Sequence, residues 1–256
     1  MNPNQIQALK GKQKIVMLTA YDYQIARILE ANNVDMILVG DSLGMVFQGN
    51  PNTKQVTMEA MLYHTQAVAK GAKTTLVTAD MPIHSYDTPE EALVNAKRLC
   101  QVGAHAVKIE GNQPEVIKLL QKHNIPVMGH VGLLPQTAEK YQVQGKTPEQ
   151  ADQIWRDSLE LDRLGVFSMV LECVPEWLAR KITHDVKTPT IGIGAGKYCD
   201  GQVLVITELL GMVSKDHLPK FVKQYTNLDK VIGKAVTEFA QEVRTGKYPD
   251  KEHTYH

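Results

Sequence analysis

Residues 74–110 decide how this chain of 256 residues folds. They contain TTLVTAD at 74–80, TPEEALVNAKRLCQVG at 88–103 and AHAVKIE at 104–110. The first and third runs are short and rich in β-branched and apolar residues, which is typical of buried strands. Each of the two runs ends on a carboxylate. The run between them has the spacing of a helix. A strand, a helix and a second strand in this order predict a parallel βαβ unit.

The helix between these strands is marked at both ends. Thr88 is a favourable N-cap, and Pro89 suits the first helical position. Glu91 completes a capping box, and Gly103 ends the helix. Similar signals bracket three more segments, so crossover helices recur along the chain. These segments run from Thr57 to Gly71, from Pro114 to Asn124 and from Thr147 to Gly165.

Short apolar runs recur along the whole chain, and most are followed by a segment with helical spacing. Eight parallel strands that alternate with helices are what a closed (β/α)8 barrel requires. We therefore predict an α/β TIM barrel that forms a single domain over residues 1–256, with a helical tail after Pro219. The predicted strands are Lys14–Thr19, Asp35–Gly40, Thr74–Asp80, Ala104–Glu110, Ile125–His130, Val166–Glu172, Thr188–Ile193 and Val203–Thr207.

A doubly wound open sheet is the competing architecture. Its usual marker is a G-x-G-x-x-G turn after the first strand. The nearest run, GIGAGK at 192–197, comes late in the chain and has Lys197 where the third glycine belongs. A tight turn after a strand is favoured over nucleotide binding for this run.

Composition and charge exclude several classes of function. Lys plus Arg equals Asp plus Glu, at 28 each, so no overall positive field favours nucleic acid or an anionic membrane. Residues 1–14 lack an apolar signal core, and no apolar run approaches the roughly 18 residues of a membrane span. Cys100, Cys173 and Cys199 form no C-x-x-C pair. We expect a cytoplasmic protein that acts on small molecules.

Ionisable side chains follow the predicted strands at the end where a barrel has its active site. Asp41, Asp80 and Glu110 are carboxylates from three consecutive strands. Barrel closure would crowd them on one rim, where they repel one another unless a cation lies among them. All-oxygen ligands suit Mg²⁺ better than zinc. Taken singly, each of these residues also has a structural interpretation, as a turn cap or an ion-pair partner.

The other strand-end residues suit an anionic substrate. Lys108 and Glu110 are two positions apart and point to the same face of their strand, so Lys108 can hold a substrate carboxylate beside a metal ligand. Glu172 ends an apolar strand, which favours a raised pKa and a role as general base. Capping the helix that follows is the alternative role for Glu172. His130 lines the pocket or is a satisfied buried histidine.

Six runs of the sequence occur in a fixed order: LTAYDY (18–23), VGDSLGM (39–45), VKIEG (107–111), GHVGL (129–133), LECVP (171–175) and IGIGAG (191–196). Together they resemble the ketopantoate hydroxymethyltransferase family, and the resemblance spans nearly the whole chain. It implies a TIM barrel of the phosphoenolpyruvate- and pyruvate-utilising type. It also implies a homo-oligomer, commonly a decamer.

The resemblance implies a reaction as well. A hydroxymethyl group would pass from 5,10-methylenetetrahydrofolate to 3-methyl-2-oxobutanoate, giving 2-dehydropantoate for pantothenate and coenzyme A biosynthesis, with Mg²⁺ as the metal. The family's metal-binding carboxylates match Asp41, Asp80 and Glu110, its substrate-binding positions match Asp41, Ser42, Asp80 and Lys108, and its proton acceptor matches Glu172.

Two stretches depart from the family pattern. Residues 137–140 lead directly into YQVQG at 141–145, where the family has a longer Gly-rich loop, and this change bears on how the site closes over folate. Residues 214–216 replace a segment that is often Gly-rich, which bears on subunit contacts. Another Mg²⁺-dependent 2-oxo-acid lyase or mutase of this barrel class is the alternative function, although the Lys-Cys-Gly-His loop of such lyases does not occur here. A catalytically silent scaffold barrel is the other alternative.

Overall fold

The structure is a computed structural model that describes residues 1–213 and 218–255. The chain divides into two compact units, residues 1–205 and residues 206–256. The first unit contains the barrel and every residue predicted for the active site. The departure from the family pattern at 214–216 lies outside the described residues.

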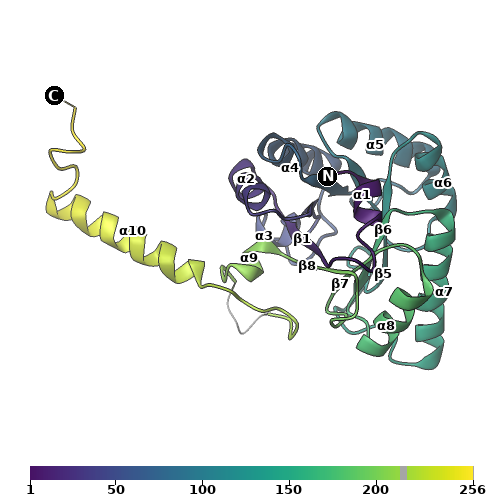
Figure 1. The fold of residues 1–256 in the computed structure, drawn as a ribbon. Helices are drawn as coiled ribbons and strands as arrows, with labels where there is room; N and C mark the ends of the chain where they lie inside the picture. Colours follow the sequence, from purple (N-terminus) through teal and green to yellow (C-terminus); the bar gives the residue numbers. More distant parts are fainter. Residues whose placement is uncertain (214–217, 256) are drawn as a thin grey trace. The chain divides into compact units, whose positions relative to one another are not determined.

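Eight parallel strands close into a barrel in chain order, and β8 pairs with β1 (Figure 1). The predicted (β/α)8 fold is confirmed, and each strand overlaps the run predicted for it. The strands are β1 (Ile15–Thr19), β2 (Met36–Val39), β3 (Leu76–Asp80), β4 (Ala106–Lys108), β5 (Val127–Gly132), β6 (Ser168–Glu172), β7 (Thr190–Ile193) and β8 (Gly201–Leu204).

The strand ends differ from the prediction for physical reasons. The sequence predicts Thr74 and Thr75 within β3, but their backbone N–H groups donate to the Glu30 carboxylate. β8 begins at Gly201, two residues earlier than predicted, and lies close against β1. A Cβ at Gly201 would lie 2.5 Å from the carbonyl oxygen of Ile15, so only glycine fits there.

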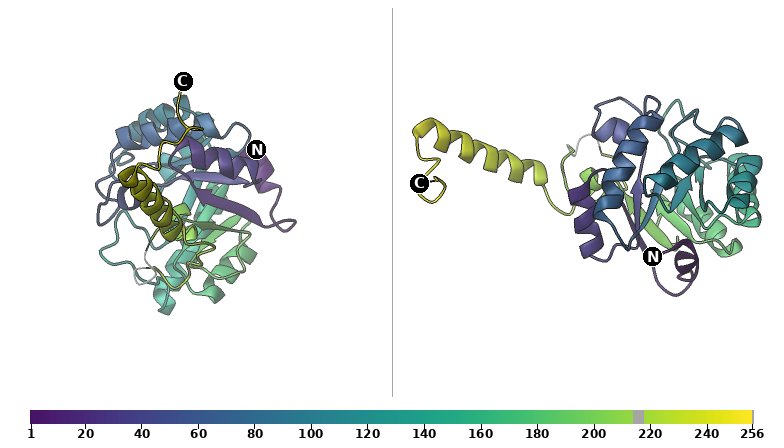
Figure 2. Two further views of the ribbon diagram at one scale, coloured as in Figure 1. Left: turned by 90° about the vertical axis from the view of Figure 1, so that its left-hand side faces the viewer. Right: turned by 90° about the horizontal axis from the view of Figure 1, so that it is seen from above.

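Helices pack around the strands of the first unit, as Figure 2 shows. Thr57, Thr88 and Thr147 are N-caps as predicted, and each side chain accepts a backbone N–H of the first turn. Gly165 ends its helix in the left-handed conformation, with φ of 79°. The helices of this unit are α1 (Pro3–Gln7), α2 (Tyr23–Ala31), α3 (Leu43–Val46), α4 (Met58–Gly71), α5 (Pro89–Gln101), α6 (Pro114–Lys122), α7 (Pro148–Leu164) and α8 (Glu176–Asp185).

No helix lies between β7 and β8 in the fully described stretch that joins them. The Gly-rich run at 192–197 contains the end of β7 and the turn that follows it. Gly194 and Gly196 have φ values of 63° and 78°, which glycine adopts at little cost. The run forms a turn, as the sequence predicts.

The second unit is mainly helical. It contains α9 (Ile206–Leu209) and α10 (Leu228–Thr245), and α10 is the helix expected after Pro219. None of the residues of α10 is buried. Over residues 1–213 and 218–255, no helix has the length and apolar character needed to cross a membrane.

The barrel interior changes from apolar to polar along the strands. Side chains alternate between the two faces of a strand, so every second residue points inward. The inward residues change from Leu76 to Asp80 on β3 and from Met128 to His130 on β5. Ile6 of α1 is fully buried and packs with the apolar layer. The strand pattern therefore gathers polar groups at the carboxyl ends, above an apolar core.

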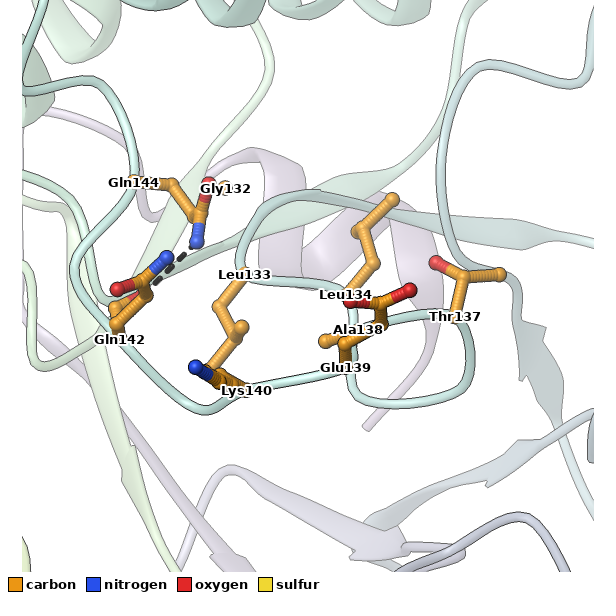
Figure 3. Close-up of a pocket in the computed structure, with 9 residues that line it drawn as sticks. All are labelled: Gly132, Leu133, Leu134, Thr137, Ala138, Glu139, Lys140, Gln142 and Gln144. Atoms are coloured by element: carbon orange, nitrogen blue, oxygen red, sulfur yellow. Dashed lines mark hydrogen bonds between the residues drawn. The ribbon is translucent and has the colours of Figure 1, made fainter.

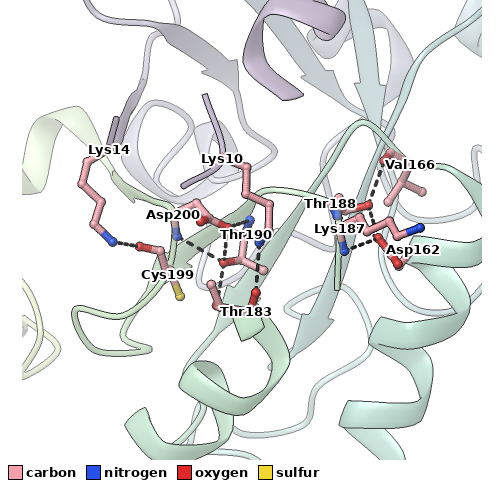
Figure 4. A network of polar contacts seen from close by, with 10 residues as sticks. All are labelled: Lys10, Lys14, Asp162, Val166, Thr183, Lys187, Thr188, Thr190, Cys199 and Asp200. Carbon is pink, nitrogen blue, oxygen red and sulfur yellow. Dashed lines mark hydrogen bonds and ion pairs between the residues drawn. The ribbon is translucent and has the colours of Figure 1, made fainter. Parts of the chain in front are cut away.

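At the other end of the barrel, a polar network holds the residues at the amino ends of β7 and β8 (Figure 4). Lys10 Nζ lies 2.7 Å from Asp200 Oδ2, and the same oxygen accepts the backbone N–H of Thr190 at 2.9 Å. Asp162, in the last turn of α7, accepts the backbone N–H and the hydroxyl of Thr188. This end of a TIM barrel contributes to stability rather than to catalysis.

We predict that Asp162→Ala lowers the free energy of unfolding by about 1–3 kcal/mol. The substitution removes the acceptor that Thr188 N and Thr188 Oγ1 approach at 2.7 and 2.8 Å, and Thr188 is buried. Urea unfolding followed by circular dichroism measures the change. Asp152→Ala is the matched control, because Asp152 is exposed on the same helix and its ion pair with Arg156 contributes about 1 kcal/mol or less. Equal losses in the two variants would contradict the prediction.

Candidate active site

The predicted acidic and basic residues lie on the rim formed by the carboxyl ends of β2 to β6. Asp41 is the second residue after β2, whereas Asp80 and Lys108 are the last residues of β3 and β4. The exposed fractions are 5% for Asp41, 2% for Asp80, 5% for Lys108 and 4% for Glu110. Because burying charge is costly without partners, the contacts among these groups determine what the rim can do.

Lys108 pairs with Asp80 across the ladder between β3 and β4. Lys108 Nζ lies 2.7 Å from Asp80 Oδ1, and both side chains are buried. The other oxygen, Asp80 Oδ2, accepts the backbone N–H of Asp41 at 3.0 Å. Burial opposes the charge on Lys108, but Asp80, Glu110 and Asp41 together raise its pKa. Lys108 is therefore a buried cation whose ion-pair partner is Asp80.

Gln136 bonds to two of the predicted metal ligands, although the sequence does not predict it for the site. Gln136 Nε2 donates to Asp41 Oδ2 at 2.8 Å, and its backbone N–H donates to Glu110 Oε2 at 3.1 Å. Tyr86 donates its hydroxyl to Gln136 Oε1 at 2.6 Å. Both residues lie between a strand and a helix, where no periodicity marks an inward side chain. The only available signal was the closeness of Gln136 to the family-like run at 129–133.

Burial raises the pKa of two rim carboxyl groups. The pKa of Asp41 is raised to about 7, mainly by burial and then by the charge of Asp80. The pKa of Glu110 is raised well above its usual value, again mainly by burial, with Lys108 opposing the rise and Asp41 adding to it. The positive charge of Lys108 does not balance these carboxylates, so the rim favours an additional cation.

The donor set of the rim fits Mg²⁺ as a metal that keeps water and substrate ligands. Among the residues that the structure describes, no three Asp, Glu, His or Cys side chains are grouped closely enough to hold a metal by themselves. Mg²⁺ commonly takes one or two carboxylates and completes its octahedron with other oxygens. Asp41 and Asp80, linked through the Asp41 N–H, are a pair of this kind, and Glu110 is the third predicted ligand.

Glu172 is more accessible than the other acids of the rim. Its side chain is 19% exposed, compared with 3% for Asp80 and for Glu110. Burial raises the pKa of Glu172 to about 7, and the charge of Lys108 opposes this rise. The predicted alternative of a helix cap is not realised, because α8 follows Pro175 without a side-chain cap. A carboxyl group that titrates near neutral pH and reaches solvent suits a general base.

His130 is buried between two of these acids. Its Nε2 lies 3.2 Å from Glu172 Oε2, and its Nδ1 lies 3.6 Å from Glu110 Oε1. Neither contact has hydrogen-bond geometry, so both ring nitrogens lack a hydrogen-bond partner among the described residues. Burial, and then the charge of Lys108, hold the pKa of His130 well below its usual range. His130 is thus a neutral ring with unused hydrogen-bonding capacity, unlike a satisfied core histidine.

Ser42 lies at the edge of the rim next to Asp41. Its hydroxyl is 2.8 Å from the Tyr21 hydroxyl. A Cβ at Gly40 would lie 2.7 Å from Ser42 Oγ and 3.6 Å from Asp80 Oδ2, so glycine allows the backbone to pass this closely. The residues predicted to bind substrate therefore come together in one part of the barrel.

A loop after β5 encloses a pocket of about 370 Å³ (Figure 3). The backbone N–H groups of Leu133 and Gln144 donate to the carbonyl oxygens of Glu172 and Cys173, at 2.9 and 2.8 Å. The pocket thus adjoins the end of β6, but none of the predicted site residues lines it. The lining residues are Gly132, Leu133, Leu134, Thr137, Ala138, Glu139, Lys140, Gln142 and Gln144.

The same loop approaches the carboxylates through Tyr141. Burial raises the pKa of Tyr141, and the charges of Asp41, Glu172 and Glu110 raise it further. Tyr141 is 49% exposed, so it lies between the rim and solvent. The shortened loop noted in the sequence thus runs beside the acids of the rim.

Solved structures with the same fold include a hydrolase and a lyase. A phosphonopyruvate hydrolase in complex with oxalate and Mg²⁺ aligns over 99% of this chain and 93% of its own, with a TM-score of 0.64 and 13% identity. A 2,3-dimethylmalate lyase of the PEP mutase/isocitrate lyase superfamily aligns over 99% and 92%, with a TM-score of 0.61 and 15% identity. At such identities the likeness establishes the fold, a TIM barrel of the predicted type.

Relatives in sequence are much closer. The 3-methyl-2-oxobutanoate hydroxymethyltransferase of Clostridium beijerinckii is 48% identical, over 97% of this chain and 93% of its own. The enzyme of that name from Thermotoga maritima is 49% identical, over 100% and 96%. The sequence profile of ketopantoate hydroxymethyltransferase matches residues 1–251. The predicted resemblance is confirmed, and the chain belongs to the ketopantoate hydroxymethyltransferase family.

Proposed function

We propose that this chain transfers a hydroxymethyl group from 5,10-methylenetetrahydrofolate to 3-methyl-2-oxobutanoate. The products are 2-dehydropantoate and tetrahydrofolate, and the reaction belongs to pantothenate and coenzyme A biosynthesis. Family membership supports this reaction. The observation that carries it is the barrel rim, on which an accessible Glu172 accompanies buried carboxylates and the cation Lys108.

Glu172 is the base in this proposal. The carbon next to the keto group of the oxo acid must lose its proton before it can attack a one-carbon unit. Glu172 combines accessibility with a pKa of about 7, so its carboxylate can accept that proton near neutral pH. The resulting enolate carbon then forms a new bond to the methylene carbon of the folate, and the bonds from that carbon to N5 and N10 of the folate break. A water molecule supplies the hydroxyl group of the product, and its other proton and the proton taken from the oxo acid end on the two nitrogens of tetrahydrofolate. His130, 3.2 Å from Glu172, lies beside the carboxylate that takes the proton.

The other rim residues orient the oxo acid. Lys108 and Ser42 bind its carboxylate, and a buried cation attracts an anion more strongly than a solvated one would. Asp41, Asp80 and Glu110 would hold Mg²⁺ together with water and substrate oxygens. When bound, Mg²⁺ supplies Lewis-acid stabilisation of the negative charge that develops on the oxo acid. Holding the reacting carbon in place lowers the entropic cost of the transfer.

The family also supports a proposal about assembly and location. We infer that the chain is a single barrel domain over residues 1–256 with a helical tail, and that it forms a homo-oligomer, a decamer. We place it in the cytoplasm, where its three free cysteines, Cys100, Cys173 and Cys199, would stay reduced. Its partners are small molecules, and neither nucleic acid nor a membrane is among them.

A Mg²⁺-dependent 2-oxo-acid lyase or mutase is the second candidate function. It is favoured by the fold, because a phosphoenolpyruvate phosphomutase from Streptomyces platensis subsp. rosaceus aligns over 96% of this chain, with a TM-score of 0.61. Cys173 is a poor nucleophile for such chemistry, since burial and the charge of Glu172 raise its pKa to about 11.

Product analysis distinguishes the two functions. The purified protein is mixed with Mg²⁺, 3-methyl-2-oxobutanoate and 5,10-methylenetetrahydrofolate, and 2-dehydropantoate is measured by mass spectrometry. The transferase forms this product in proportion to enzyme concentration. A protein that exchanges the substrate proton but forms no 2-dehydropantoate would favour the lyase or mutase.

We predict that Glu172→Gln slows proton exchange at C3 of 3-methyl-2-oxobutanoate at least about 100-fold. Glutamine keeps the size of the side chain but cannot accept the proton. The exchange is followed by NMR in D₂O with Mg²⁺, first without folate and then with tetrahydrofolate. Glu176→Gln is the matched control, because Glu176 is exposed at the start of α8. Exchange at the wild-type rate in Glu172→Gln would remove Glu172 from the role of base.

We predict that kcat/KM for the oxo acid increases with pH up to about 7 and then levels off. Protonated Glu172 cannot accept a proton, and its raised pKa of about 7 means that this form dominates at lower pH. Initial rates between pH 5.5 and pH 8.5, at a fixed and saturating concentration of Mg²⁺, measure the profile. A rate that is constant across this range would show that no group titrating near pH 7 acts as the base.

A further inference from the structure

The segment after β5 brings a neutral side chain between the rim carboxylates. Gln136 is 2% exposed, and its Nε2 donates to Asp41 Oδ2 at 2.8 Å and to the Met81 carbonyl oxygen at 2.9 Å. Its backbone N–H donates to Glu110 Oε2 at 3.1 Å. Gln136 thus joins carboxylates that follow β2 and β4, strands that are separated by β3 in the barrel.

Tyr86 completes the hydrogen bonding of the Gln136 amide on the side away from Asp41. Its hydroxyl donates to Gln136 Oε1 at 2.6 Å and accepts the backbone N–H of Glu110 at 3.4 Å. In a flipped amide, the carbonyl oxygen of Gln136 would face the Asp41 carboxylate and the Met81 carbonyl, so acceptors would meet without a proton between them. The network therefore has one satisfied arrangement, which the Asp41 and Met81 acceptors fix and the Tyr86 hydroxyl completes.

Gln136 satisfies its carboxylates without adding charge. Lys108 neutralises Asp80, whereas the amide and the N–H of Gln136 occupy one oxygen each of Asp41 and Glu110 and add no positive charge. A second lysine here would compete with a metal ion for these acids. A neutral donor orients the two carboxylates and leaves Asp41 Oδ1 and Glu110 Oε1 without a bond from Gln136.

We propose that Gln136, oriented by Tyr86, is a positioning residue that fixes Asp41 and Glu110 for a divalent cation. The inference rests on the proposed function only in taking the rim as a cation site. Loss of the amide would let the Asp41 carboxylate turn away from Glu110, which the backbone N–H still holds, so the cation would bind more weakly. A residue that only fastened the loop to the barrel would affect stability and leave the cation affinity of the folded protein unchanged.

The test measures Mn²⁺ binding by electron paramagnetic resonance at 25 °C, on full-length protein without substrate. Gln136→Met keeps the length of the side chain and the backbone N–H that donates to Glu110 but removes the Nε2 donor to Asp41, and we expect its dissociation constant for Mn²⁺ to be raised at least about tenfold. Tyr86→Phe removes the donor to Gln136 Oε1 and so holds the amide less firmly, and we expect its dissociation constant to be raised at least about threefold. Gln150→Met is the control on α7, exposed and without such contacts, and should bind as the wild type does.

The outcomes separate this inference from the proposed function. Circular dichroism establishes that each variant is folded, and if Gln136→Met does not fold, Tyr86→Phe decides the test. A folded variant of either kind that binds Mn²⁺ within twofold of the wild type overturns the inference, as does a wild-type protein that binds none. A wild type that binds Mn²⁺ but forms no 2-dehydropantoate would sink the proposed function and leave the role of Gln136 intact. With Mg²⁺ in the transfer assay, the variants should need more metal for half-maximal rate.

Discussion

The burial of several acids around a lysine is the constraint on which the active end of this barrel depends. Each buried charge costs several kcal/mol unless partners compensate for it. Asp80 meets this requirement through Lys108, and Asp41 and Glu110 meet it through Gln136. These contacts join residues on or after β2, β3, β4 and β5, so the rim is satisfied only when these four strands are assembled. Fold and site are therefore stabilised by the same contacts.

Within this rim, the residues divide into a fixed part and an accessible part. The fixed acids are held by a cation, an amide or a backbone N–H, which suits groups that must keep their geometry through a catalytic cycle. Glu172 is held more loosely, since its contact with His130 lacks hydrogen-bond geometry. A base must take up a proton and release it, and a rigid network of hydrogen bonds around Glu172 would favour only one of its two protonation states.

The sequence predicts the barrel well because alternate residues of a strand point to the same face, so a residue's position in its run determines the direction of its side chain. Asp80, Lys108 and Glu172 could be placed on the rim from their positions at the ends of apolar runs. The same reasoning does not reach Gln136 or Tyr86, because a side chain in a connection has no period that fixes its direction. The sequence also predicts the start of β8 too late, because glycine is unfavourable within a strand. Gly201 is nevertheless the first residue of β8, since the close approach to β1 leaves no room for a Cβ.

Closure of the barrel also has a consequence for how the chain acquires its structure. β1 pairs with β8, Ile15 opposite Gly201, so the pairing that completes the sheet joins residues 186 positions apart in the sequence. Pairings of such long range are slow to form, because a long loop must close before they contribute any stability. During synthesis β1 emerges first and lacks one of its two neighbours until β8 has been made. For most of that time, one edge of a nascent sheet is open to other chains, which makes this stage the most exposed to aggregation.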